Sequence, residues 1–458
     1  MRLRRVPCAL TIAGSDSSGG AGIEADLKTF AALQVYGTCA ITAVTAQNTR
    51  EVYAIFPMQA DVVKKQVETI LADFQISALK TGMLYTQENV NTVADLIGKS
   101  RLKAVVDPVF VAGSGKRLIL DDALDVLLRR LMPKALVVTP NIPEAEMITG
   151  VKIATVDDMK NAAVSIAKLG PKAVVIKGGH LKRGIVTDIF YFRNKFQSYT
   201  KPRIEVKAHG SGCTFSAAIT AYLAKELRVP QAVAMAEQFM KDALTHHLNV
   251  GRGRPPVNPL ALLYNEAEKF RVIEEISATV RIIENSPEFA PYIPEVGTQV
   301  AMALPFASSP QEVAAIEGRI IRLADRPKAV GLIRFGASSH MARVILTAMH
   351  YDPTFRAAMN IRHAPELITA FKNLKFNISS FDRKLELPEV KVIEGGTLTW
   401  GVEQAIKETK EMPSVIFDLG EVGKEPMIRV LGKTATEVVL KTFSAINALK
   451  KKRGKKQR

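Results

Sequence analysis

From Ala9 to about Val250, short apolar runs alternate with stretches whose apolar residues recur at helical spacing. The apolar runs are bounded by loop residues and are typical of buried parallel strands. They are Leu10–Ala13, Ala78–Thr81, Ala104–Asp107, Leu136–Thr139 and Ala173–Lys177. Helical periodicity occupies stretches between them, such as Asp61–Phe74 and Met159–Leu169. The alternation predicts a doubly wound α/β sandwich, in which ligands gather beyond the carboxyl ends of the strands.

A change in composition ends this region. Residues 251–259 are rich in glycine, proline and arginine, which indicates a linker, and helical periodicity follows over Leu260–Glu284. A second, smaller α/β region comes next, with strands expected near Ala329–Phe335 and Ser414–Leu419. Its helices are expected over Glu312–Leu323, Ala342–Met349, Leu398–Lys410 and Ala435–Leu449. The predicted division is 1–250, a linker at 251–272, 273–449 and a tail at 450–458.

The net charge of +17 suggests nucleic-acid binding until its location is considered. Residues 450–458 hold seven basic residues and no acidic one, which leaves about +10 on the rest of the chain. Such a tail can bind RNA or anionic surfaces nonspecifically, but we expect a solvated, disordered end and no specific nucleic-acid partner. Phosphorylated substrates account for part of the remaining positive charge.

The cysteines and the apolar runs bear on the compartment. Cys8, Cys39 and Cys213 are widely spaced and offer neither a disulfide framework nor paired metal-ligand spacing. No apolar run is long enough to cross a membrane, and the short run Val6–Ala13 leads into a glycine-rich loop, so a first strand is expected rather than a signal peptide. A reducing, cytoplasmic location without membrane contact is expected, and we expect a homo-oligomer.

The segment His209–Thr214 carries the most informative chemistry. Gly210, Ser211 and Gly212 remove bulky side chains from the backbone just where a helix begins, so N–H groups and the positive helix end converge on an anion such as phosphate. The helix is predicted from apolar residues on one face, which are Phe215, Ala218, Ile219, Tyr222 and Leu223. Cys213 falls in the first turn, where we expect an acidified thiol that serves as proton acceptor or anion-hole donor. The alternative is an ordinary glycine turn with a buried cysteine.

Polar residues end or follow the other predicted strands. A glycine-rich loop at residues 13–22 lacks both the P-loop and the dinucleotide pattern, and its small residues let a flat substrate approach the backbone. Gln47 offers an amide that can donate to and accept from an aminopyrimidine edge. Asp107 and Glu144 supply carboxylates for Mg²⁺, Asn141 supplies an amide and Lys177 a cation. Together these are the parts that phosphoryl transfer from ATP requires.

The motifs GSDSSGGAG, DLKTF, TAVTAQNT, KTGML, DPVFVAGSG, TPNIPEAE, VIKGGH and HGSGCTFSAAI closely resemble the hydroxymethylpyrimidine and phosphomethylpyrimidine kinases of thiamine biosynthesis, within the ribokinase-like fold. The resemblance covers about Ala9–Val250. It implies that Gly14, Asp26, Gln47 and Met83 bind the pyrimidine. It also places Asn141, Asp107 and Glu144 at a magnesium and phosphate site, has Lys177 touch the nucleotide phosphates, and makes Cys213 the acid-base or anion-hole group. Pyridoxal kinases share the fold, so vitamin B6 phosphorylation is the alternative.

The second region repeats the theme of a strand, small residues and a helix in Gly331–His340. Ser338 and Ser339 either help to form an anion site or merely cap the helix. Acidic groups at 418–425 follow a strand, so they hold magnesium or cap a helix. The motifs GASSH and GKEP, with the segment Glu317–Ile320, resemble the ThiN-type thiamine-phosphate synthase domain over about Ile273–Leu449.

That resemblance implies condensation of the pyrimidine diphosphate with thiazole phosphate, with release of pyrophosphate. It assigns Arg319 and His340 to phosphate or pyrophosphate handling, although Glu317 stands where proline is expected. Two consecutive activities on one chain favour a bifunctional enzyme, since tethering keeps the intermediate near its next site. The alternative is a second region that only senses a thiamine-related phosphate, but the helix-turn-helix expected beside such a sensor is not seen in the sequence.

Overall fold

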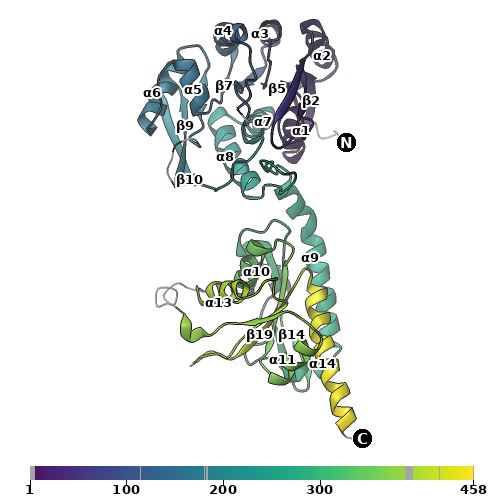
Figure 1. Ribbon diagram of the computed structural model, residues 1–458. Coiled ribbons are helices and arrows are strands. Elements are labelled where there is room, and N and C mark those ends of the chain that lie inside the picture. Colours follow the sequence, from purple (N-terminus) through teal and green to yellow (C-terminus); the bar gives the residue numbers. More distant parts are fainter. Residues whose placement is uncertain are drawn as a thin grey trace. The chain divides into compact units, whose positions relative to one another are not determined.

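The computed structural model describes residues 6–456 apart from 114, 180, 182, 183, 387–395 and 422, and for 452–456 it describes the backbone alone. The chain forms two compact units, Met1–Leu262 and Leu263–Arg458 (Figure 1). His180, the last residue of the VIKGGH motif, lies outside the described residues. In the described parts of the chain, no helix is long and apolar enough to cross a membrane.

The first unit contains an eight-stranded sheet in the order β10-β9-β8-β7-β6-β5-β1-β2. Its strands are β1 (Cys8–Ala13), β2 (Tyr36–Ile41), β5 (Ile76–Thr81), β6 (Lys103–Val106), β7 (Val137–Val138), β8 (Ala173–Ile176), β9 (Ile185–Phe192) and β10 (Lys195–Pro202). The six strands from β8 to β2 run parallel, and β9 and β10 add an antiparallel edge. A separate hairpin consists of β3 (Ala43–Gln47) and β4 (Val52–Pro57).

Helices cover both faces of this sheet, as the alternating pattern predicts (Figure 1). On one face lie α2 (Ala60–Asp73), α3 (Gln87–Ser100), α4 (Asp121–Val126), α5 (Ile142–Thr149) and α6 (Val156–Ala167). On the other lie α1 (Gly22–Ala32), α7 (Ser211–Ala224) and α8 (Val229–Thr245). The residues of β8 are all fully buried because the sheet is covered on both sides. The predicted doubly wound architecture is confirmed.

The second unit contains a seven-stranded mixed sheet in the order β15-β12-β11-β16-β19-β18-β17. These strands are β11 (Val300–Ala303), β12 (Val313–Ile316), β15 (Ile333–Phe335), β16 (Ala357–Arg362), β17 (Ile378–Ser380), β18 (Val415–Asp418) and β19 (Met427–Gly432). A hairpin of β13 (Ile320–Leu323) and β14 (Arg326–Ala329) stands apart from the sheet. One face packs against α9 (Ala261–Glu284), α11 (Pro365–Asn373) and α14 (Ala435–Lys456), and the other against α10 (Ser339–Tyr351) and α13 (Gly396–Lys407).

Two expectations about the elements of this half of the chain need correction. The expectation of a helix over Glu312–Leu323 is wrong. This segment forms strands β12 and β13, separated by a turn in which Gly318 and Arg319 have left-handed backbone conformations. All four residues of β12 are buried, so the helical spacing in the sequence reflected a central strand with two covered faces. The linker expected at 251–272 extends too far, since α9 begins at Ala261 and buries Val272 in the core of the second unit.

The basic tail also differs from the expectation of a disordered end. Helix α14 continues to Lys456, and the Lys450 ammonium lies 3.3 Å from a carboxylate oxygen of Glu288. Residues 457 and 458 lie outside the described part of the chain.

Candidate active site

A cavity of about 860 Å³ lies at the carboxyl ends of the parallel strands of the first unit. Residues from five successive strand ends line it, which are Gly14, Gly82, Asp107, Asn141 and Lys177. The turn 210–213 at the start of α7 lines it as well, together with Gln47, Met83 and Glu144. The structure therefore brings together nearly all of the kinase residues expected from the sequence. The exception is Asp26.

Asp26 is fully buried and does not line the cavity. Its carboxylate pairs with the Lys80 ammonium at 2.5 Å and accepts a hydrogen bond from the Thr11 hydroxyl at 2.7 Å. Lys80 is also completely buried. The expectation that Asp26 binds substrate is therefore not supported, because this carboxylate neutralises a buried lysine instead.

The turn 210–213, called the catalytic turn below, lies directly against the glycine-rich loop at residues 13–22, called the substrate loop below. Gly210 adopts φ +79°, and a Cβ at this position would lie 1.8 Å from the carbonyl oxygen of Gly20. At Gly212, a Cβ would lie 3.3 Å from the Lys177 ammonium and 3.6 Å from an Asp107 carboxylate oxygen. These two glycines let the backbone N–H groups of the turn approach both the substrate loop and the charged pair.

Cys213 lies in the first turn of α7, as expected, but its thiol is not acidified. Burial raises the pKa of the Cys213 thiol to about 11, and the positive charge of Lys80 only partly opposes this. The sulfur therefore carries a proton at neutral pH. In this state it suits the role of anion-hole donor that the sequence left open, and acting as a base would require a further shift of its pKa.

Asp107, Glu144 and Lys177 form a charged cluster on the cavity wall. The Lys177 ammonium lies 3.2 Å from Asp107, which also accepts hydrogen bonds from the Thr139 hydroxyl at 2.9 Å and the Ser216 hydroxyl at 3.2 Å. Burial tends to raise the pKa of Asp107, but Lys177 and Lys80 outweigh it and lower this pKa. Asp107 is therefore an ionised carboxylate at neutral pH.

Glu144 has a different environment, although it belongs to the same cluster. Burial raises its pKa to about 7, with Lys177 opposing and the Asp107 carboxylate adding to this shift. Glu144 and Asn141 also form the capping box of α5, in which Asn141 accepts from the Glu144 N–H at 2.9 Å and Glu144 accepts from the Asn141 N–H at 2.7 Å. Asn141 is thus a helix cap that holds Glu144 in place.

The donor set fits a hard cation such as Mg²⁺. Two carboxylates, those of Asp107 and Glu144, share a wall with one lysine, and Mg²⁺ commonly binds through one or two carboxylates together with waters and substrate phosphates. Among the described residues no group of three or more His, Cys, Asp or Glu side chains could hold a metal ion. Any Mg²⁺ here would therefore depend on water and phosphate ligands.

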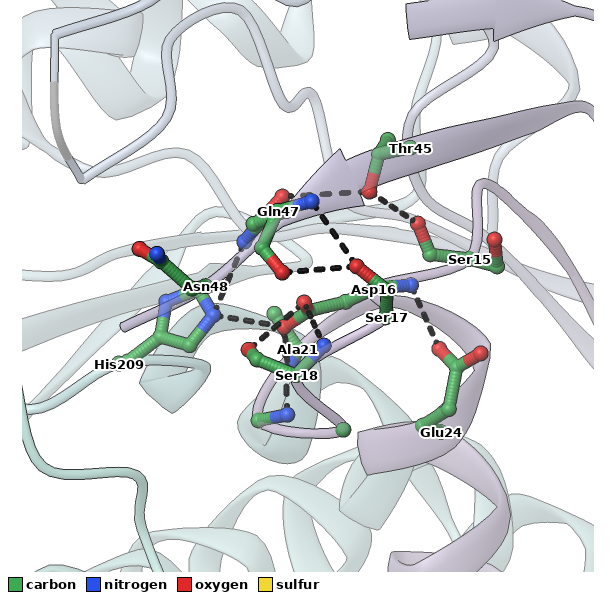
Figure 2. Close-up of polar contacts among 12 residues, drawn as sticks. Ser15, Asp16, Ser17, Ser18, Ala21, Glu24, Thr45, Gln47, Asn48 and His209 are labelled. Atoms are coloured by element: carbon green, nitrogen blue, oxygen red, sulfur yellow. Dashed lines mark hydrogen bonds and ion pairs between the residues drawn. The ribbon is translucent and has the colours of Figure 1, made fainter. Parts of the chain in front are cut away.

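Gln47 also lines the cavity and belongs to a hydrogen-bonded network (Figure 2). The nearest atoms of the Gln47 amide and the His209 ring lie 3.0 Å apart, and His209 Nε2 lies 2.7 Å from an Asp16 carboxylate oxygen. Burial tends to raise the pKa of Asp16, but hydrogen bonds from His209 and Ser18 outweigh it and lower this pKa to about 2. The Ser17 hydroxyl donates to the Gln47 backbone carbonyl at 2.7 Å, which ties the loop to the end of β3.

Sequence reasoning assigned no role to Asp16 or His209. Asp16 was visible as a polar residue after the first strand, and His209 opens the HGSGC segment. Their pairing across 193 residues of sequence follows only from the packing of the glycine-rich loop on the catalytic turn.

In the second unit the structure separates the residues that were assigned to one site. Gly336 donates to the carbonyl of Val313, at the start of β12, so Ser338 and His340 follow that end of the β12–β15 ladder. Arg319 lies beyond Ile316, at the other end of the same ladder. The ladder alone spans roughly 10 Å, at ~3.4 Å per residue. Ser338 caps α10 by accepting from the Met341 N–H at 3.3 Å, in agreement with the capping alternative, and Ser339 and His340 are exposed.

The Arg319 end of the sheet also holds a buried cluster of charges. Asp418 pairs with Arg383 and Arg429, each at 2.6 Å, and both guanidinium groups lie over the Phe381 ring. Burial tends to raise the pKa of Asp418, but the two arginines outweigh it and lower this pKa. The expectation that Asp418 holds magnesium or caps a helix is wrong, because both carboxylate oxygens are committed to arginines.

Comparison with known proteins agrees with this division into two sites. A family model described as phosphomethylpyrimidine kinase matches residues 16–258, and one described as thiamine-phosphate synthase ThiN matches residues 275–443. The chain is 35% identical over 434 residues to the bifunctional thiamine biosynthesis protein ThiDN of Methanocaldococcus jannaschii, which covers 94% of this chain and 96% of that protein. The chain belongs to the bifunctional kinase and synthase family of thiamine biosynthesis. Its kinase domain is 42% identical over 266 residues to the hydroxymethylpyrimidine/phosphomethylpyrimidine kinase of Bacillus subtilis, covering 57% of this chain and 98% of that one.

Solved structures confirm the fold predicted for the kinase domain. The pyridoxal kinase of Bacillus subtilis in complex with ADP is 38% identical, with a TM-score of 0.54 over 57% of this chain and 99% of that one. The pyridoxal kinase of Staphylococcus aureus, in complex with AMP-PCP and pyridoxal, is 36% identical, with a TM-score of 0.51 over 56% of this chain and 94% of that one. The kinase domain thus has the ribokinase-like fold of enzymes that bind adenine nucleotides.

Proposed function

We propose that the first unit transfers phosphoryl groups from ATP to 4-amino-5-hydroxymethyl-2-methylpyrimidine, giving first the phosphate and then the diphosphate. One observation carries this proposal. Gln47, Lys177 and the carboxylates of Asp107 and Glu144 line a single cavity. The turn at the start of α7 connects them, because His209 contacts Gln47 and a Cβ on Gly212 would lie 3.3 Å from the Lys177 ammonium. A flat polar ring beside Gln47 and a polyphosphate beside Lys177 can therefore occupy the same cavity.

The residues of the first unit have separate tasks in this mechanism. Gln47 orients the pyrimidine, and the N–H groups of Gly212 and Cys213 stabilise charge on the transferring phosphoryl group. Lys177 holds the nucleotide phosphates, while Asp107 and Glu144 would hold Mg²⁺, which shields phosphate charge when bound. The protonated Cys213 thiol donates toward the same anion.

The test of these roles is a Cys213→Ala variant assayed with saturating Mg²⁺ and varied ATP. We expect kcat to fall ~10²-fold while KM for ATP changes less than about threefold, because the thiol acts at the transferring group and not on the nucleotide. Equal turnover by the two proteins would refute a catalytic role for Cys213.

Pyridoxal is the second candidate substrate, because the solved relatives of the kinase domain include pyridoxal kinases at 36–38% identity. The assay that separates the two compares kcat/KM for hydroxymethylpyrimidine and for pyridoxal under the same conditions. We expect the pyrimidine to be preferred, and a preference for pyridoxal would replace it as the main substrate.

For the second unit we propose condensation of the pyrimidine diphosphate with thiazole phosphate, giving thiamine phosphate and pyrophosphate. Arg319 and His340 bind the phosphate and pyrophosphate groups in this proposal. Their positions at opposite ends of the β12–β15 ladder make it difficult for one subunit to apply both to the same group.

A homo-oligomer resolves this separation. Strand β15 is an edge of the sheet, and Leu332 beside it is 65% exposed. If two copies paired antiparallel along β15 across a two-fold axis, the Arg319 end of one sheet would meet the Ser338–His340 end of the other.

Mixing two inactive variants tests the shared site directly. Arg319→Ala and His340→Ala chains, refolded or co-expressed together, would form mixed dimers in which one of the two sites is intact. We expect about a quarter of the synthase activity to return, from random pairing of the two chains. If each variant is inactive and the mixture is inactive too, Arg319 and His340 do not act across a subunit interface.

A further inference from the structure

Figure 2 shows three side chains that converge: Asp16 from the loop after β1, Gln47 from the end of β3 and His209 from the turn before α7. All three line the cavity. His209 Nε2 lies 2.7 Å from Asp16 Oδ2 and 3.0 Å from the Gln47 amide atom that the structure places as nitrogen. The single ring nitrogen Nε2 therefore faces both a carboxylate and an amide. The positions of the hydrogens on these three groups must therefore agree with one another.

The surroundings of Asp16 fix the proton on His209. Asp16 Oδ1 accepts from the Ser18 N–H at 2.9 Å and the Ser18 hydroxyl at 2.7 Å, and Oδ2 accepts from the N–H groups of Gly20 at 3.2 Å and Ala21 at 2.8 Å. A carboxyl group surrounded by donors on both oxygens is ionised and can only accept. His209 Nε2 must therefore carry a hydrogen and donate it to Asp16.

That hydrogen determines which end of the Gln47 amide faces the ring. An amide NH₂ group directed at an N–H would bring two donors together, whereas the amide oxygen can share the one Nε2 hydrogen with Asp16 as a second, weaker acceptor. The other end of the amide leads to the same conclusion. The Thr45 hydroxyl donates its one hydrogen to the Ser15 carbonyl at 2.8 Å, so it can only accept from the Gln47 amide atom 3.5 Å away, which the structure places as oxygen. Figure 2 draws the Gln47 amide with its nitrogen toward His209 and its oxygen toward Thr45. Both neighbours are satisfied when the amide is turned by 180° about its last bond, so that its oxygen faces His209 and its NH₂ group faces Thr45.

We propose that Asp16 and His209 are positioning residues that lock the Gln47 amide with its NH₂ group turned into the cavity, where it donates to an acceptor nitrogen of the substrate ring. This inference rests on the proposed function for the identity of the substrate. Gln47 and Thr45 both line the cavity, so the N–H that does not face Thr45 is available to a ligand. The site then recognises a ring nitrogen, and the exocyclic amino group of the pyrimidine is recognised elsewhere.

The same pair of residues joins the substrate loop to the catalytic turn. A Cβ on Gly20 would lie 2.6 Å from the His209 ring, and one on Gly210 would lie 1.8 Å from the Gly20 carbonyl oxygen. His209, which positions the Gln47 amide, is therefore packed against the substrate loop next to the turn that carries Cys213. Loss of the Asp16–His209 contact is expected to affect pyrimidine binding more than nucleotide binding, because Lys177 and Asp107 lie on other strands.

The first experiment reads the proton directly and needs no assumption about function. Long-range ¹H–¹⁵N NMR spectra of the full-length protein, with the His209 signals assigned from a His209→Gln variant, distinguish a ring protonated at Nε2 from one protonated at Nδ1 only. We expect hydrogen on Nε2. A neutral ring with its hydrogen on Nδ1 alone would overturn the proposal.

The second experiment uses a matched pair of variants. His209→Leu removes the donor, whereas the side-chain amide of His209→Gln can place an N–H close to the position of Nε2. We expect His209→Leu to raise KM for hydroxymethylpyrimidine about tenfold, as loss of one hydrogen bond predicts, with KM for ATP unchanged. In His209→Gln we expect the KM for hydroxymethylpyrimidine to return most of the way to the wild-type value. Equal increases in both KM values, or no recovery in His209→Gln, would show a merely structural role and refute the proposal.

Substrate analogues complete the test in the wild-type enzyme. In each analogue one ring nitrogen is replaced by C–H. For one of these analogues we expect the KM of the wild-type enzyme to rise about tenfold, because the partner of the Gln47 amide is absent. The Gln47→Ala substitution should then cause no further increase in the KM for that analogue. If Gln47→Ala instead raises KM for every analogue except the one that lacks the amino group, Gln47 presents its oxygen to that amino group and the proposal is wrong. If the wild-type protein phosphorylates no pyrimidine, the proposed function fails, while the NMR result still decides the position of the proton.

Discussion

Replacing Gly210 by alanine should uncouple the catalytic turn from the substrate loop. At this position the backbone has φ +79°, and the new Cβ would lie 1.8 Å from the Gly20 carbonyl oxygen. Real Cβ atoms essentially never come within 3.0 Å of another heavy atom, so the two segments must separate by at least 1.2 Å. The obstacle is backbone on both sides, which cannot rotate away as a side chain can.

The loss of folding free energy in Gly210→Ala has two contributions, and a control variant separates them. The left-handed backbone alone costs alanine ~1 kcal/mol, and the close contact adds the displacement of the turn. Gly150 ends helix α5 with φ +71°, and a Cβ added there would meet no atom of the described residues within 4 Å. Gly150→Ala should therefore carry the backbone strain without the displacement.

The assay compares unfolding free energy and kinase turnover in both variants. We expect Gly150→Ala to lose ~1 kcal/mol of stability with kinase kcat unchanged. Gly210→Ala should lose more stability, and its kcat should fall ~10²-fold, because a displacement of ~1 Å at reacting groups is enough for such a loss. Wild-type turnover in Gly210→Ala would refute the idea that this close contact sets the geometry of the catalytic turn.

Three further predictions follow from the charged groups. The folded-state pKa of Glu144 is raised from 4.5 to about 7, so ionisation of Glu144 opposes folding above pH 4.5. Because Mg²⁺ binds the ionised carboxylate, activation of the kinase by Mg²⁺ should strengthen between about pH 6 and pH 8. This pH dependence of Mg²⁺ activation should vanish in Glu144→Gln, and its persistence there would assign it to another group. In a protein with Cys8 and Cys39 replaced, iodoacetamide should label Cys213 slowly at neutral pH and faster toward pH 11, and rapid labelling at neutral pH would contradict a protonated thiol. Asp418→Asn should lower the stability of the synthase unit by ~3–5 kcal/mol in calorimetry of the full chain, because two buried guanidinium groups lose their carboxylate, and an unchanged transition would refute a structural role for Asp418.

Much of the kinase site could be predicted from the sequence because its residues are local to strand ends. Parallel strands bring their carboxyl ends to one edge of the sheet, so Asp107 and Lys177 meet without any knowledge of distant contacts. The burial of Asp26 could not be predicted in this way. A carboxylate in the first helix looks the same in sequence whether it faces a ligand or a buried lysine such as Lys80.

The synthase unit was harder to predict because its sheet is mostly antiparallel. Its successive motifs fall at alternate ends of the strands, so Arg319 and His340 are separated although each follows a strand-like segment. The expectation of an acidified Cys213 thiol is also wrong, because it takes into account only the helix N-terminus. The helix end favours a thiolate, but burial of the sulfur has the larger effect and raises its pKa.

The most direct test of the two-site account supplies the full-length protein with hydroxymethylpyrimidine, thiazole phosphate, ATP and Mg²⁺ and measures thiamine phosphate. We expect thiamine phosphate and pyrophosphate to form, with Cys213→Ala strongly slowed unless the pyrimidine diphosphate is supplied ready-made. Accumulation of pyrimidine diphosphate without thiamine phosphate would contradict the proposed role of the second unit. A protein that phosphorylates pyridoxal but no pyrimidine would contradict the proposed role of the first.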